Sequence, residues 1–83
     1  SEKLLKMQVD LGEPALRQIV AGIGKQYAPE QLVGRQIVVV SNLKPATLMG
    51  VESRGMVLAA TMPDGAPVLL STERELPNGS GIK

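Results

Sequence analysis

Two neighbouring segments indicate the fold most clearly: NLKP at residues 42–45 and GVESRGMVLAA at residues 50–60. In the second segment Gly55 precedes an apolar run, as in a β-strand that another backbone or a ligand approaches closely. We therefore expect a strand over Gly55–Thr61. Before it, proline and glycine mark Asn42–Gly50 as a loop that carries polar side chains.

The chain before these segments predicts three more strands. Apolar and polar residues alternate over Lys3–Leu11, which favours a half-buried strand, and Gly12–Pro14 supplies a turn into a second strand over Leu16–Gly22. Four β-branched residues stand in a row at Ile37–Val40. Such a run is typical of a strand covered on both faces, so we expect the strand Arg35–Ser41 to be the best-defined part of the core.

Two smaller elements complete the prediction. Ala28–Gly34 is typical of one helical turn, with Pro29 near its start, and Pro67–Leu70 predicts a short fifth strand. Short strands with one brief helical turn indicate an all-β fold, a small barrel. The periodicity alone fits an SH3-like barrel almost as well as an OB barrel.

Composition limits the chemistry. The chain has 83 residues, enough for one small domain, and no histidine or cysteine, so the usual zinc ligands and a disulfide are missing. We expect no metal and no cofactor. No apolar run is long enough for a membrane span and no signal peptide is visible, so we expect no membrane partner and a cytoplasmic location.

The charge is nearly balanced, at +1 overall. A non-specific nucleic-acid binder is usually far more basic, so any electrostatic attraction must be local. The central part, residues 14–51, is the basic part: it holds four Lys or Arg residues against Glu30 alone.

The two opening segments together resemble the signature of the tRNA-binding domain of methionyl-tRNA synthetases and related free-standing tRNA-binding proteins. Residues 3–5, 9–12, 19–23 and 32–34 also match that family, so the resemblance covers nearly the whole chain. It implies a five-stranded OB-fold barrel with a short helical turn and a C-terminal β segment, many members being homodimers that bind the folded corner of tRNA. The family's first strand would precede Ser1, so we expect residues 1–83 to be one domain that lacks this strand at its N-terminus.

The same resemblance implies a non-catalytic module that binds tRNA. Asn42 and Lys44 lie on the loop where OB folds commonly bind ligands, and Ser53 and Arg54 precede Gly55 at the entry to the next strand. Lys and Arg donors there suit phosphate and ribose groups. The full set of candidate RNA-binding residues is Asn42, Lys44, Ser53, Arg54 and Met56, with Lys25 and Arg35 as peripheral charge.

Each residue also has a plainer interpretation. Asn42 and Ser53 are common in turns, and Lys44 and Arg54 are ordinary on a solvated surface. Met56 suits either the core or contact with a base. The family often carries a basic side chain near Met49 and a serine at Ala21, so these two positions predict fewer contacts here.

Other functions find less support in the residues. Tyr27 is the only aromatic residue, which disfavours a groove that stacks single-stranded bases. No nucleophile or general base of a recognised motif is present, and residues 22–25, GIGK, lack the spacing of a phosphate-binding loop. The alternatives that stay open are a module for dimerisation and a peptide-binding, chaperone-like module with weak RNA affinity.

Overall fold

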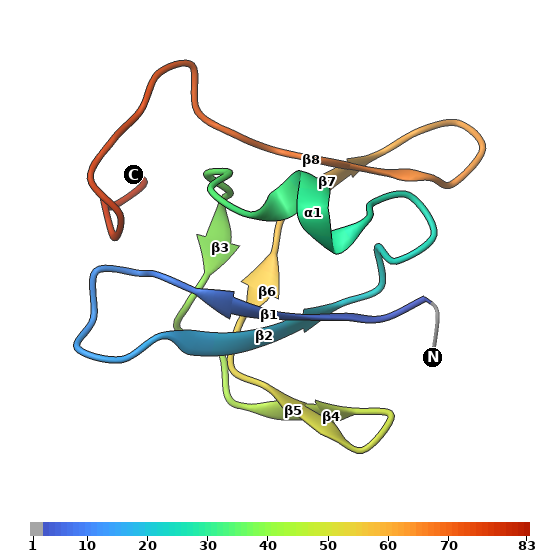
Figure 1. Cartoon of the computed structure of the whole chain (residues 1–83), viewed down its shortest axis with the longest axis horizontal. Helices are drawn as coiled ribbons and strands as arrows, with labels where there is room; N and C mark the ends of the chain where they lie inside the picture. The colour runs from blue at the N-terminus through green and yellow to red at the C-terminus, as the bar shows by residue number, and fades with distance from the viewer. Residues whose placement is uncertain (1–2) are drawn as a thin grey trace.

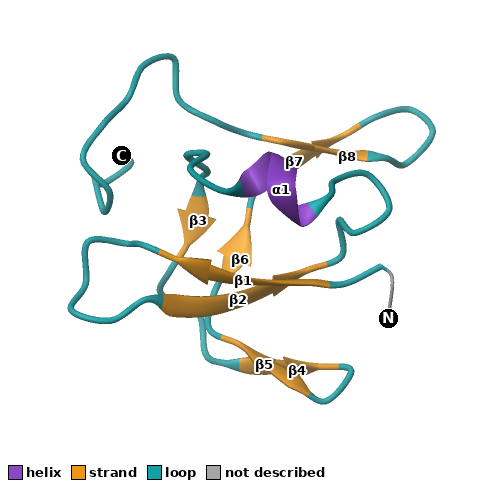
Figure 2. Cartoon of the chain, in the orientation of Figure 1, coloured by secondary structure: helices purple, strands orange, loops and turns teal. Residues whose placement is uncertain are grey.

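The protein consists of short strands and one short helix. The computed structural model describes residues 3–83, and strands predominate in them (Figures 1 and 2). The elements in chain order are β1 (Leu5–Val9), β2 (Arg17–Ala21), α1 (Pro29–Leu32), β3 (Val39–Val40), β4 (Ala46–Leu48), β5 (Val51–Ser53), β6 (Met56–Val57), β7 (Ala59–Thr61) and β8 (Pro67–Leu69). The all-β class predicted from the sequence is confirmed.

The strand ladders form four antiparallel pairs: β1 with β2, β3 with β6, β4 with β5 and β7 with β8. Three of these join neighbours in sequence, whereas β3–β6 encloses the β4–β5 hairpin. Leu58 connects two of the pairs, since its N–H donates to the Val38 carbonyl at 2.9 Å and its own carbonyl accepts from Leu70 N–H at 3.3 Å. The pairs are therefore linked at β6–β7.

The hairpin of β1 and β2 forms as the sequence predicts. Met7 lies opposite Ile19 in the register, and Leu5, Met7 and Val9 face inward while the residues between them face solvent. In the turn between the strands, Gly12 has a positive φ of 75° and donates its N–H to the Asp10 carboxylate at 2.8 Å. Glycine adopts this left-handed conformation at little cost, so it allows the turn.

The helical turn α1 appears in the same part of the molecule as β7 and β8 (Figure 1). Pro29 occupies its first turn, and the Gln31 carboxamide accepts the Ala28 N–H at 2.7 Å, which satisfies a donor at the helix start. The Tyr27 hydroxyl accepts the N–H of Leu69 at 3.1 Å. Tyr27 thus fastens the chain before α1 to β8.

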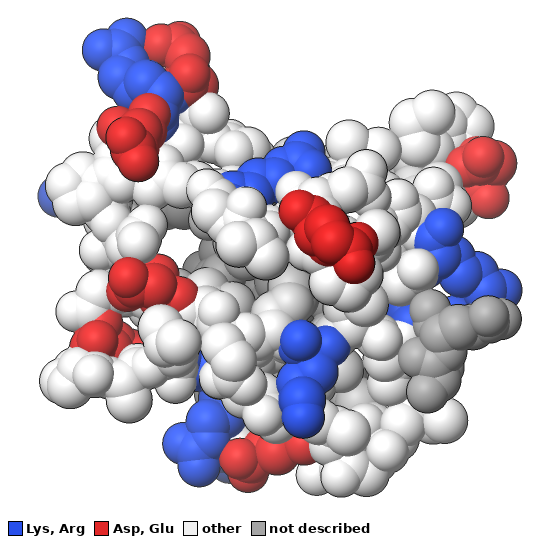
Figure 3. Space-filling model, in the orientation of Figure 1, with Lys and Arg blue, Asp and Glu red and all other residues white. Residues whose placement is uncertain are grey.

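The buried core is small. Among the described residues its apolar members are Ile19, Val20, Ile23 and Leu69. The expected burial of Ile37–Val40 on both faces is wrong, because all four residues are only half-buried. They line a cavity of about 960 Å³ that lies between β1, β3 and the C-terminal segment, and Figure 3 shows it as a hollow on this face.

Two predicted elements differ from the structure. The strand expected over Arg35–Ser41 forms a ladder only at Val39–Val40. The residues before Val39 line the cavity and have no ladder partner among the described strands. The segment expected as a loop over Asn42–Gly50 contains β4, whose hairpin with β5 turns at Met49 and Gly50. Both turn residues have positive φ, 51° and 80°, the pattern of a two-residue type I′ turn.

The strand expected over Gly55–Thr61 is present as β6 and β7, which are separated at Leu58. At its start, a Cβ added to Gly55 would lie 3.1 Å from both the Ile19 Cδ1 atom and the Val40 carbonyl oxygen. The absence of a side chain at Gly55 therefore lets this strand cross closely over the most deeply buried residue of the core.

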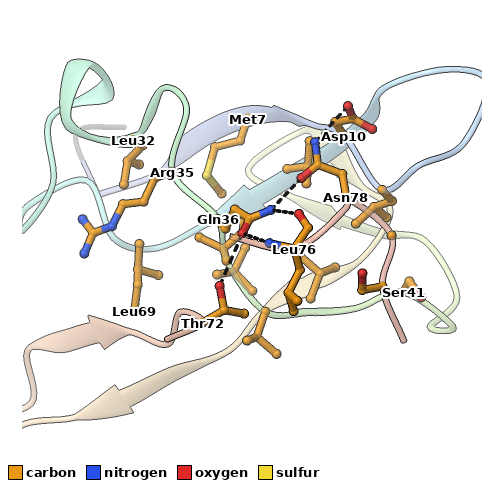
Figure 4. A pocket seen from close by; sticks show the side chains of 18 of the residues that line it. Met7, Asp10, Leu32, Arg35, Gln36, Ser41, Leu69, Thr72, Leu76 and Asn78 are labelled. Atoms are coloured by element: carbon orange, nitrogen blue, oxygen red, sulfur yellow. Dashed lines mark hydrogen bonds between the residues drawn. The ribbon is translucent and has the colours of Figure 1, made fainter. Parts of the chain in front are cut away.

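The C-terminal segment crosses the molecule and closes one side of the cavity (Figure 4). The Gln36 carboxamide oxygen accepts the Leu76 N–H at 3.0 Å, and its nitrogen donates to the Leu76 carbonyl and to Asn78. Asn78 in turn donates to the Asp10 carboxylate at 3.1 Å. One side chain of the strand-like segment before β3 thus anchors the tail.

Candidate nucleic-acid interface

The candidate residues of the 42–56 region lie on and beside the β4–β5 hairpin. This hairpin projects from the molecule on the side of β1–β2 that is opposite to α1 and β8 (Figure 1). Every residue from Ser41 to Gly50 is exposed. The segment therefore offers polar groups to a partner with little rearrangement of the core.

Strand β2 holds three consecutive residues, 52–54, at the end of β5 where the hairpin returns to the body of the protein. The Gln18 carbonyl accepts the Arg54 N–H at 2.9 Å, the Gln18 carboxamide donates to the Glu52 carbonyl at 2.7 Å, and Val20 N–H donates to the Ser53 hydroxyl at 2.9 Å. Residues 52–54 are consequently the most firmly held part of the region.

Ser53 differs from its expected role. Its side chain is only 2% exposed, and its hydroxyl accepts from Val20 and donates to the Gly55 carbonyl at 2.9 Å. A hydroxyl whose hydrogen bonds are satisfied inside the protein is not available to RNA in this conformation. We therefore leave Ser53 out of the contact surface, since its place is beneath that surface.

Asn42, Lys44 and Arg54 are exposed and lie on the segments that flank the β4–β5 hairpin. The Arg54 guanidinium lies 3.0 Å from the Glu52 carboxylate, so part of its charge is neutralised. Within residues 3–83, no carboxylate lies within ion-pair distance of Lys44. Lys44 is therefore the side chain best suited to bind a phosphate here. Met56 is also exposed and lies opposite Val40 in the β3–β6 ladder.

Lys25 and Arg35 do not join this group. Both belong to the chain on either side of α1, on the far side of the β1–β2 hairpin in Figure 1. The Arg35 guanidinium lies 5.6 Å from the centre of the Tyr27 ring, a cation–π contact. Basic and acidic side chains are interspersed over the face in Figure 3, which shows no large area of one sign.

Arg17 is the important residue of this region that the sequence analysis did not select. Its guanidinium donates to the main-chain carbonyls of Ser41 and Arg54, and it also forms an ion pair with Glu13. Glu13 is four positions from Arg17, but the two carbonyls lie 24 and 37 positions away, so nothing in the local pattern identifies the contact with them. Arg17 brings the beginning and end of the candidate segment together.

The described residues offer no cluster for a metal ion. Within residues 3–83, no three acidic side chains lie together in a way that could hold one. The same residues contain no helix with the length and apolar character that a membrane span requires.

Comparison with known protein families accounts for nearly all of the chain. Residues 1–81 match the family model described as "Putative tRNA binding domain". The chain belongs to this tRNA-binding domain family. The matched region is a non-catalytic part of methionine–tRNA ligase, distinct from the catalytic domain of that enzyme.

Curated relatives of this tRNA-binding domain are methionine–tRNA ligases. The chain is 59% identical over 83 residues to the ligase of Methanothrix thermoacetophila and 51% identical over 82 residues to that of Caldanaerobacter subterraneus. These matches cover 100% and 99% of the chain but only 12% of each ligase. The domain thus corresponds to a small part of these enzymes.

Solved structures share its fold. A protein related to methionyl-tRNA synthetase from Pyrococcus horikoshii superposes with a TM-score of 0.89 at 41% identity, over 100% of this chain and 75% of that one. The chaperone CsaA of Bacillus anthracis superposes equally well, with a TM-score of 0.89 at 40% identity, over 96% of this chain and 76% of that one.

Proposed function

We propose that this domain is the tRNA-binding module of a methionine–tRNA ligase, and that it binds folded tRNA through phosphate and ribose contacts made by Asn42, Lys44 and Arg54. The family match over residues 1–81 is the observation that carries this proposal. Exposed polar groups on a hairpin anchored to β2 supply the surface. We further propose that the complete barrel is of the OB type and that the domain acts in the cytoplasm, where tRNA is charged.

The residues favour recognition of shape over recognition of stacked bases. The hydroxyl of Tyr27, the only aromatic residue, is bonded to Leu69, and its ring faces Arg35. A groove that stacks successive bases uses several exposed rings. Donors such as Lys44 and Asn42 instead suit the backbone and 2′-hydroxyl groups of a folded RNA. Lys25 and Arg35 belong to the segments beside α1, which lie across the β1–β2 hairpin from β4 and β5 (Figure 1). In this proposal they act only through long-range attraction.

Lys44→Ala provides the direct test. Labelled tRNA would be titrated at two salt concentrations, and we expect the variant to bind more weakly and to lower the magnitude of the log-salt slope by about 0.9, as for one lost phosphate contact. The melting temperature should hardly change, because the side chain is exposed.

Glu73→Lys is the control for net charge, because it changes the charge of the domain at a position outside the proposed surface. Glu73 is exposed on the C-terminal segment, where it pairs with Arg74, outside the proposed surface. If this substitution alters affinity as much as Lys44→Ala does, the localised surface is refuted. Unchanged affinity of Lys44→Ala would remove Lys44 from the surface.

We also propose that the domain forms a homodimer, because it exposes more surface than a compact monomer does. Its accessible surface is 6113 Å², whereas a monomer of 8.8 kDa is expected to expose about 4,800 Å². The excess of about 1,300 Å² exceeds the roughly 800 Å² that each partner buries in a standard interface. Val68 and Leu70 on and beside β8 are exposed and apolar, as a contact between copies requires.

Sedimentation of the domain at micromolar concentration would test this association. We expect the mass of a dimer, and a mass that stays that of the monomer would refute it. An apolar interface should also persist as the salt concentration rises, whereas tRNA binding should weaken steeply. Association without any salt-dependent tRNA binding would favour the alternative of a dimerisation or peptide-binding module.

A further inference from the structure

The Arg17 side chain binds both ends of the segment that carries the proposed RNA contacts. One guanidinium nitrogen, Nη1, donates to the Ser41 carbonyl at 2.5 Å and to the Arg54 carbonyl at 3.1 Å. On the other side, Nε and Nη2 donate to the two carboxylate oxygens of Glu13, at 3.2 Å and 2.5 Å. The side chain is 21% exposed.

The position of these two carbonyls gives the contact its importance. The chain leaves the body of the protein at Ser41, runs through the exposed β4–β5 hairpin and returns at Arg54. The residues that enclose this segment, Val40 and Met56, are already paired in the β3–β6 ladder. Arg17 adds a side-chain bridge next to that ladder, between Ser41 on the outgoing arm and Arg54 on the returning arm. The bridge limits how far the two arms can separate.

Between β3 and β4, the hydrogen bond from Arg17 is the one that joins the outgoing arm to the rest of the described residues. Residues 41–50 are all exposed, whereas the returning arm is bonded to β2 at Glu52, Ser53 and Arg54. A segment with few buried contacts opens locally at low free-energy cost. The β4–β5 ladder joins the two arms from Ala46 onward. At the base of the segment, Arg17 joins the arm carrying Asn42 and Lys44 to the arm carrying Arg54.

We propose that Arg17 is a positioning residue for RNA binding, oriented by Glu13, and that it does not itself contact RNA. Four of its five N–H groups are committed inside the protein. A phosphate at Arg17 would also have to compete with the Glu13 carboxylate. Because the two arms are already fixed in the free protein, less conformational entropy is lost when RNA binds. A residue that does not touch the ligand can raise the affinity in this way.

This inference rests on the proposed function, but its first readout does not require RNA. Arg17→Lys keeps the charge yet lacks the planar fork that reaches Glu13 and both carbonyls together, and Arg17→Gln removes the charge. We expect both variants to speed hydrogen exchange at the amides of β4 and β5 and at Arg54 N–H, while the amides of the β1–β2 ladder keep their protection.

The second readout is tRNA affinity at two salt concentrations. Both variants should weaken binding about fivefold, the equivalent of roughly one lost hydrogen bond, with the log-salt slope unchanged. Glu13→Gln should give a smaller change in the same direction. Arg74→Gln, an exposed arginine paired with Glu73 on the C-terminal segment, is the matched control and should change neither readout.

Two results would overturn the proposal. If exchange in β4 and β5 stays as slow as in the parent protein, Arg17 does not hold the segment. If Arg17→Lys binds normally while Arg17→Gln lowers the slope by about 0.9, Arg17 contacts phosphate directly. If exchange is faster in the Arg17 variants but the parent protein does not bind tRNA, the structural role of Arg17 is supported and only the proposed function is refuted.

Discussion

The hydroxyl of Ser53 links β2 to β5 from within the protein, and its removal should destabilise the fold. In Ser53→Ala the buried Val20 N–H loses its acceptor. Leaving a buried donor unpaired costs about 1–3 kcal/mol of unfolding free energy. Chemical denaturation would measure the loss, with the exposed Ser41→Ala as the control. A loss as small as that of the control would mean that the hydroxyl is dispensable.

Asp10 gives the tail a dependence on pH. The Gly12 N–H and, to a smaller extent, the Asn78 amide donate to its carboxylate and hold the pKa of Asp10 below its ordinary value of 3.8. Because the pKa is lower in the folded protein, the stabilisation is present above the unfolded pKa. It is lost as the pH falls through the folded pKa.

We therefore expect the tail to stay docked from neutral pH down to about pH 4 and to loosen in stronger acid. An acid titration followed by NMR at Asn78 and Gly79 would detect this step. In Asp10→Asn the step should vanish, because the side chain no longer titrates. A step of equal size in that variant would assign the pH dependence to another carboxyl group.

The β4–β5 hairpin has an unfavourable residue at its turn. Met49 has a φ of 51°, in the left-handed region, and is 77% exposed, so no packing compensates for the conformation. Asparagine adopts this conformation more readily, and Asn-Gly is a preferred type I′ pair. Met49→Asn should thus stabilise the hairpin by up to about 1 kcal/mol, measured as slower hydrogen exchange in β4 and β5. Met62→Asn, another exposed methionine with an ordinary φ, should not do so.

The local elements were the predictable part of this fold. Alternation predicted β1, and proline and glycine predicted α1 and the turn that leads into β2, because these signals depend on neighbours in sequence. The burial of Ile37–Val40 was mispredicted, since burial depends on what lies across the cavity. The β4–β5 hairpin was missed because Ala46–Leu48 is short and Met49 is an unusual residue for its turn.

The candidate site was predictable in outline only. The sequence singled out Asn42, Lys44 and Arg54, which are all exposed and lie on the segments that flank the β4–β5 hairpin. It could not separate them from Ser53, whose neighbour Val20 lies 33 positions away, nor could it reveal Arg17 as the bridge. Such roles arise from contacts between distant segments, which periodicity does not report.

The large exposed surface of the whole domain predicts a stability that depends on protein concentration. If copies associate and so bury the excess of about 1,300 Å², the folded state gains free energy by mass action. The melting temperature should then rise as the concentration is increased from micromolar to millimolar. Val68→Glu, at an exposed position on β8, should remove the rise. A melting temperature that is constant across this range would show that the domain is stable as a monomer.

The seam between the tail and the first turn has a consequence for the rate of unfolding. Asp10 and Asn78 are separated by 68 positions, and the backbones of Gly12 and Gly79 approach so closely that a Cβ on either would collide with the other segment. Forming this seam requires closure of almost the whole chain into a loop, so it should form after most local pairings. Contacts absent from the transition state slow unfolding and leave the folding rate nearly unchanged. The C-terminal segment should therefore determine how long the native state lasts more than how fast it forms.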